Sequence, residues 1–190
     1  MPRTVDIEER RQEITDAAAR LIARAGIGAA TMRDVAAEAG WTTGTVTHYF
    51  ADKRELLVQT LQASLSSRRR ERPVREQQGA AAALRASLAG ALPLDEASRQ
   101  HWMVTVAFCA QAAGDDELGG VQRDAYREFR GHVATLVTQL LDTDADESLA
   151  TAERLIAFTD GVAMQALFDT ESWPAEHQLA ELDLTLAALV

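Results

Sequence analysis

The sequence predicts an all-α protein with a small N-terminal head and a larger helical body. Only 4 of its 190 residues are proline and 11 are glycine, while alanine and leucine are abundant, a composition that favours helices. Apolar residues also recur three or four positions apart along most segments, which places them on one face of a helix. We therefore expect about nine helices, three of them in the head.

The composition also excludes several classes of protein. No apolar run reaches 18 residues, so we expect no contact with a membrane, and residues 1–14 are too charged for a signal peptide. A single cysteine, Cys109, rules out an internal disulfide. Its apolar neighbours in sequence favour a buried thiol over a redox sensor. We expect a cytoplasmic protein without cofactor or metal.

Charge is distributed unevenly along the chain. Residues 1–78 hold 13 Lys+Arg and 11 Asp+Glu, a net of +2, and residues 79–190 have a net of −12, giving −10 overall. Because exposed charges are screened beyond about 8 Å at physiological salt, an acidic body need not repel a polyanion from the head. The acidic body favours a cationic ligand, or it is simply a well-solvated surface.

The segment 31–53 predicts two short helices joined by a tight turn. Thr31 and Asp34 have the spacing of a capping box, which starts the first helix. Gly40 ends this helix, since glycine tolerates the positive φ of a C-cap. A preceding helix, expected over residues 7–25, braces the pair and completes a three-helix head.

The second helix of this pair, expected from Thr43 to Tyr49 after a Thr42 cap, has an unusual surface. No Asp or Glu occurs between Thr42 and Ala51. Hydroxyls, an imidazole and a phenol without a carboxylate suit contact with phosphates and base edges. Lys53 stands in the first turn of the next helix, where the helix dipole disfavours a cation, so we expect an anion from a partner beside it.

This segment resembles the DNA-binding signature of the TetR family of transcriptional repressors. The similarity covers residues 14–61 and rests on Thr31, Val35, Ala36, Ala39, Gly40, Thr42, Gly44, Thr45, Val46, Tyr49, Phe50, Lys53 and Leu56. Two positions depart from the family pattern. Thr47 stands where tyrosine is common, and Trp41 stands where a smaller aliphatic residue is usual, and we expect it to pack in the turn.

The resemblance implies a helix-turn-helix DNA-binding domain over residues 1–52 and an effector-binding and dimerisation domain over residues 53–190. It also implies a set of DNA contacts. We expect base-edge contacts from Thr43, Thr45 and His48, phosphate contacts from Thr31, Arg33, Thr42, Thr47, Tyr49 and Lys53, and close backbone approach at Gly44. For Arg3, Arg10 and Arg11 both phosphate contact and plain solvation remain open.

The body is expected to follow a connecting helix that runs from Asp52 to about Arg70. Five further helical segments are predicted over residues 79–92, 95–113, 118–141 and 144–169 and from Pro174 onward. The basic run of residues 66–75 suits a solvated helix end better than a second DNA contact.

The last two predicted helices are apolar on more than one side, so they need further partners. Pairing with the same helices of a second subunit supplies them and makes a homodimer. Residues 160–169, with Trp173 and Pro174, resemble the C-terminal dimerisation region of TetR regulators of the choline/betaine type. A symmetric dimer would read a palindromic operator in double-stranded DNA through successive major grooves, about 34–36 Å apart.

The resemblance further implies an apolar pocket for a small-molecule effector in the body. Candidate lining residues, each of which is equally a candidate for plain core, are Trp102, Met103, Phe108, Phe129, Phe158 and Met164. The four histidines are scattered without HExxH spacing, and we expect no enzyme. The sequence thus predicts a repressor that a ligand releases from DNA. The alternative, a helical ligand-binding or adaptor protein without DNA binding, leaves the acid-free helix face unexplained.

Overall fold

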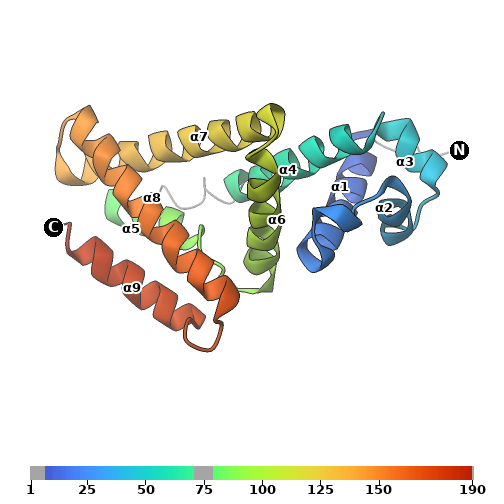
Figure 1. Cartoon of the computed structure of the whole chain (residues 1–190). Helices are drawn as coiled ribbons and strands as arrows, with labels where there is room; N and C mark the ends of the chain where they lie inside the picture. The colour runs from blue at the N-terminus through green and yellow to red at the C-terminus, as the bar shows by residue number, and fades with distance from the viewer. Residues whose placement is uncertain (1–6, 71–78, 190) are drawn as a thin grey trace, which may run out of the picture. The chain divides into compact units, whose positions relative to one another are not determined.

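The computed structural model of the protein describes residues 7–70 and 79–189, and every regular element in these ranges is a helix (Figure 1). The predicted fold class is confirmed. The elements are α1 (Ile7–Ala25), the 3-10 helix η1 (Ile27–Ala29), α2 (Met32–Ala39), α3 (Thr43–Tyr49), α4 (Lys53–Arg70), α5 (Ala80–Ala89), α6 (Glu96–Ala112), α7 (Asp116–Leu141), α8 (Ala145–Phe168) and α9 (Ala175–Ala187). Arg3 and the predicted basic run beyond residue 70 lie outside the described residues.

The chain forms two compact units. The first comprises Met1–Ser66 and Met103–Gln122, and the second comprises Ser67–Trp102 and Arg123–Val190. The first unit extends past residue 52, the expected end of the head, because the first turns of α4 share a core with α1. Leu56 and Leu61 of α4 are both fully buried in that core.

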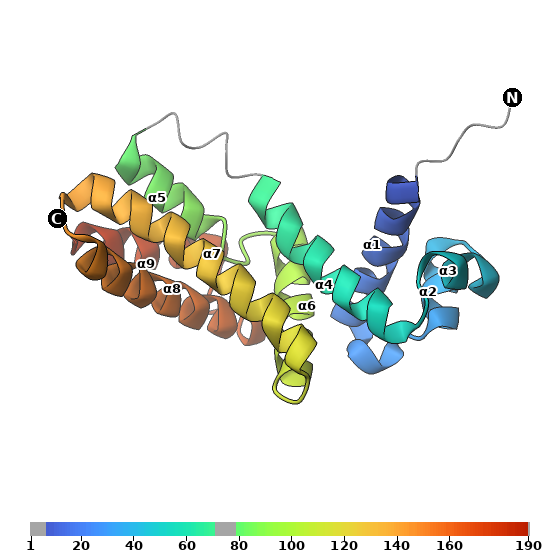
Figure 2. The ribbon, with the colours of Figure 1, turned by 90° about the horizontal axis from the view of Figure 1, so that it is seen from above.

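The core of the first unit is built on the apolar stripe of α1. Ile14, Ala18 and Ile22 recur at helical spacing and are almost completely buried. Helices α1 and α2 pack together, as do α2 and α3 (Figures 1 and 2). Phe108 of α6 completes this core with no exposed surface.

Local hydrogen bonds set the boundaries of α2. The Thr31 hydroxyl accepts the amide of Asp34 at 3.2 Å and donates to the Asp34 carboxylate at 2.6 Å. The expected cap is present, although Asp34 binds the hydroxyl of Thr31 and not its amide. Gly40 ends α2 in the left-handed conformation, with φ of 74°, as the turn requires.

In the second unit, α9 packs beside α5 and α8 (Figure 2). Arg85 of α5 forms an ion pair with Asp183 of α9. The Arg99 guanidinium caps the end of α8 by donating to the carbonyl oxygens of Ala166 at 3.1 Å and Leu167 at 2.7 Å. None of the described helices combines the length and apolar character needed to cross a bilayer.

Replacing Gly40 with alanine tests how far the turn depends on its left-handed residue. A Cβ at this position meets no atom within 4 Å, so only the positive φ opposes it. We expect Gly40→Ala to lower the free energy of unfolding by about 1 kcal/mol, measured by urea denaturation. Gly28→Ala, equally open but without positive φ, is the matched control, and an equal loss in both variants would contradict this account.

Candidate nucleic-acid interface

Two buried side chains attach α3 to the first unit. Val46 and Phe50 have no exposed surface, so they fix which side of this two-turn helix faces outward. The outward side is the one predicted to meet DNA. Its exposed members are Thr42, Thr43, Gly44, Thr47 and His48, while Thr45 and Tyr49 are half-buried at its margin.

Several hydroxyls of this surface already form bonds within α3. The hydroxyls of Thr42 and Thr45 lie 3.0 Å apart, and Thr42 also accepts the Thr45 amide at 3.1 Å. Thr47 donates to the Gly44 carbonyl at 3.1 Å. Each hydroxyl keeps further acceptor capacity, so these bonds orient the side chains without removing them from recognition.

Other polar groups of this surface have no partner within the described part of the chain. Arg33 and Thr43 are exposed and form no polar contact there, and the His48 imidazole touches only the edge of the Tyr49 ring, at 5.2 Å between centroids. These donors and acceptors are available to a ligand. Base edges and phosphates offer the complementary groups.

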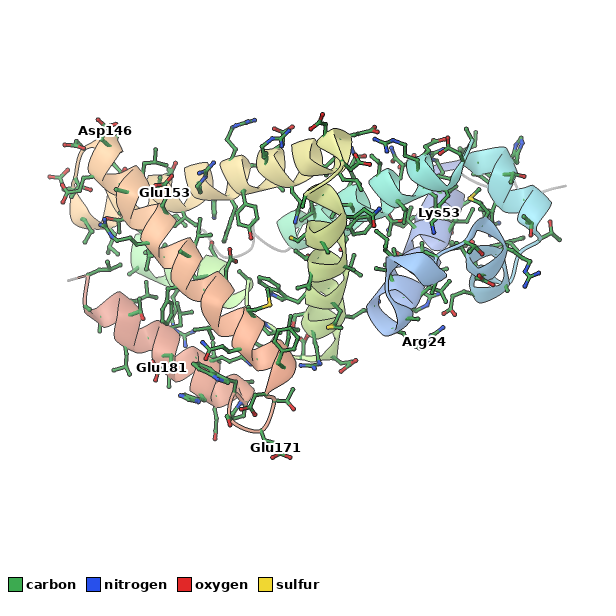
Figure 3. All side chains as sticks on the ribbon, viewed as in Figure 1. Arg24, Lys53, Asp146, Glu153, Glu171 and Glu181 are labelled. Carbon is green, nitrogen blue, oxygen red and sulfur yellow. The ribbon has the colours of Figure 1, made fainter. Side chains whose placement is uncertain are left out.

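Lys53 has a partner within its own unit. Its ammonium donates to the carbonyl oxygen of Ile27 at 3.3 Å and is half-buried (Figure 3). Within the chain, the neighbour of this ammonium is thus a neutral carbonyl oxygen. The anion that the sequence led us to expect would come from a partner and bind beside it. Because an ammonium carries three donors, two remain for a phosphate.

Two carboxylates of the first unit, those of Glu55 and Glu38, are paired with arginines of α1. Glu55 accepts from Arg11 at 2.9 Å and from the Ala51 amide at 2.7 Å, and these bonds, the Arg11 contact foremost, lower its pKa. Glu38 binds Arg24 and Arg20, which likewise lower its pKa. Both acids therefore stay ionised but are paired with arginine, so neither presents an unpaired negative charge to a duplex.

The candidate effector residues do not gather in one unit. Met103 and Phe108 belong to the first unit, where Met103 is exposed and Phe108 is core. Trp102, Phe129, Phe158 and Met164 belong to the second unit. Of these, Trp102 is buried and its indole donates to the Ala91 carbonyl at 2.7 Å.

The expectation that Cys109 is buried was wrong, since its side chain is exposed. Successive helical residues point about 100° apart, so Phe108 can face the core while the next residue faces outward. Gln122 donates to the Cys109 sulfur at 3.3 Å. Within the described residues no group of three His, Cys, Asp or Glu side chains is placed to hold a metal ion.

A helix-turn-helix head with an outward face lacking carboxylates, followed by a helical body, defines a class of DNA-binding regulators. Comparison of the sequence with known protein families supports this class. Residues 14–60 match the description "Bacterial regulatory proteins, tetR family", and residues 80–190 match "BetI-type transcriptional repressor, C-terminal". The chain belongs to the TetR family and has a BetI-type C-terminal region. It is a DNA-binding transcriptional regulator and not an enzyme, and the resemblance noted from the sequence is confirmed.

Individual relatives support this assignment. The regulator PksA of Bacillus subtilis is 32% identical over 174 residues, which cover 89% of this chain and 84% of the relative. The regulator BetI of Burkholderia lata is 31% identical over 166 residues, covering 85% and 84% respectively.

Solved structures share the architecture. A transcriptional regulator from Rhodococcus sp. Rha1 superposes with a TM-score of 0.85 at 27% identity, covering 94% of this chain and 95% of the other. A regulator from Saccharomonospora viridis in complex with choline also gives 0.85, at 24% identity, with 95% and 96% covered. At that identity the second similarity concerns the fold alone.

Replacing Lys53 with alanine tests its proposed phosphate contact. We expect weaker binding to all DNA sequences alike and a salt slope flatter by about one unit, since one phosphate neutralisation is lost, measured by fluorescence anisotropy over a salt series. Arg127→Ala removes the same charge from the exposed surface of the second unit and should leave the slope unchanged. A loss that depended on base sequence would contradict the assigned role.

Proposed function

We propose that this regulator is a homodimeric repressor that a small-molecule ligand releases from a palindromic operator. The observation that carries the proposal is the outward face of α3, where Thr43 and His48 form no hydrogen bond within the described residues and lie in a stretch without carboxylates. In this proposal Thr43, Thr45 and His48 meet base edges in the major groove. The phosphates are held by Thr31, Arg33, Thr42, Thr47, Tyr49 and Lys53, and Gly44 lets the backbone approach.

Exposed apolar side chains on α8 and α9 support the dimer. Phe168 is 78% exposed and Leu184 is 66% exposed, and Leu149 and Met164 are also exposed on α8. Large apolar groups gathered on adjacent surface helices mark interaction sites. Pairing α8 and α9 with the same helices of a second copy would cover them in a symmetric four-helix interface, and the two-fold axis would match an operator palindrome.

A carboxylate bonded to a tyrosine in the second unit supports a cationic effector. The Tyr126 hydroxyl of α7 donates to Asp160 of α8 at 2.8 Å. Phe129 and Phe158 lie on the same two helices and are half-buried. Aromatic faces and a carboxylate are the groups that recognise a quaternary ammonium ion, and the similar regulator from Saccharomonospora viridis was solved with choline. We propose choline or a related cation as the effector class.

Selection of DNA fragments by the purified full-length protein tests the proposal. We expect enrichment of a palindrome whose half-sites are about one helical turn apart, and release of that DNA when choline is added. The same titration with the Asp160→Asn variant should retain operator binding and respond weakly to choline. Recovery of fragments without any shared motif would refute the operator, while a palindrome unaffected by choline or its analogues would refute only the effector class.

Charge introduced on the apolar surface of α8 and α9 tests the dimer. We expect Phe168→Glu combined with Leu184→Glu to give a monomer by analytical ultracentrifugation and to weaken operator binding by at least about a hundredfold, since one half-site is lost. Ile7→Glu, at an apolar side chain of α1 that is 67% exposed, is the control and should stay dimeric. A double variant that remained dimeric would place the interface elsewhere.

A further inference from the structure

Two consecutive arginines of α1 reach opposite ends of α3. The Arg10 guanidinium lies over the indole ring of Trp41, 4.0 Å from its centroid, and also bonds Glu13. Trp41 directly precedes the Thr42 cap of α3 and packs against the core of the first unit. Arg10 therefore holds the turn through which the chain enters the recognition helix.

Arg11 contacts the other end of α3. Its guanidinium donates to the Tyr49 carbonyl, in the last turn of the helix, and lies over the ring of Phe50, 4.4 Å from the centroid. A cation at a helix C-terminus is favoured by the dipole and by the unpaired carbonyls there. The ion pair of Arg11 with Glu55, at 2.9 Å, ties the same point to the start of α4.

The environment of these two arginines differs from that of a phosphate contact. Their side chains are only 16% and 25% exposed, and each is paired with a carboxylate of its own unit. Arg33, by contrast, is exposed without a partner in the described residues. A duplex could engage Arg10 or Arg11 as a phosphate ligand only by breaking contacts that already satisfy them.

The recognition helix needs such external support. α3 is seven residues long, and Val46 is its one buried residue. Helices of this length are unstable alone, because too few hydrogen bonds follow the costly first turn. Contacts at its two ends therefore add to its packing against α2 in setting its direction.

We infer that Arg10 and Arg11 are positioning residues that fix the axis of α3 from α1, and that Trp41 is the platform through which Arg10 acts. The inference rests on the proposed DNA contacts of α3. It gives a role to Trp41, which departs from the family pattern. It also separates these arginines from Arg33 and Lys53, which it leaves as candidates for direct phosphate contact.

Operator and unrelated DNA, titrated with the full-length protein over a salt series, distinguish positioning from phosphate contact. We expect Arg11→Ala to lower the ratio of specific to nonspecific affinity by about tenfold, comparable to losing one base contact, with the salt slope unchanged. Arg33→Ala should flatten the slope by about one unit with the ratio unchanged. An Arg11→Ala variant that behaved like Arg33→Ala, or like the unchanged protein, would overturn the inference.

Trp41 supplies a second test that does not depend on the stability of the arginine variant. Trp41→Phe keeps a ring face for Arg10, so it should retain most of the specific-to-nonspecific ratio, whereas Trp41→Leu should lower it as Arg11→Ala does. Circular dichroism at the assay temperature checks that each variant is folded. Equal ratios for both substitutions would overturn the role of Trp41. If the unchanged protein itself showed no sequence preference, the proposed DNA interface would fail, and this inference with it.

Discussion

Burial of Val46 and Phe50 in the core that they share with α1 and α2 is the interaction on which the rest of the first unit depends. Both side chains are completely buried, and removing such groups from water is the main source of stability available to a two-turn helix. This anchoring fixes the rotation of α3 about its own axis. Once that rotation is set, the hydroxyls and the imidazole of the helix face outward together.

Ion pairs engage two of the acids in the first unit, while one arginine stays exposed. The acids Glu38 and Glu55 are paired with arginines of α1, whereas Arg33 keeps its side chain exposed. Glu38 and Glu55 therefore carry no unpaired negative charge, whereas the exposed carboxylate of Asp52, just beyond α3, accepts the backbone amide of Glu55 at 2.8 Å. A duplex meets the local arrangement of charges, not the net charge of −10, because more distant charges are screened.

Much of this could be predicted from the sequence because the signals are local. Caps at Thr31 and Thr42 and the glycine at Gly40 set the helix boundaries through bonds between residues three or four apart, so their pattern is visible in one dimension. The contacts of Arg11 with Tyr49 and Glu55 join residues 38 and 44 positions apart, and no spacing rule reveals them. Cys109 shows the same limit. Its apolar neighbours did not decide which side of α6 it occupies, because that depends on how the helix packs.

The outward face of α3 is the surface that we propose enters the major groove. The most direct measurement is a crystal structure of the full-length protein bound to its selected operator. The account requires α3 of each protomer in successive major grooves, with the His48 imidazole against base edges and Arg11 still bonded to the Tyr49 carbonyl. A complex in which α3 lay outside the groove, or in which His48 faced the protein core, would contradict it.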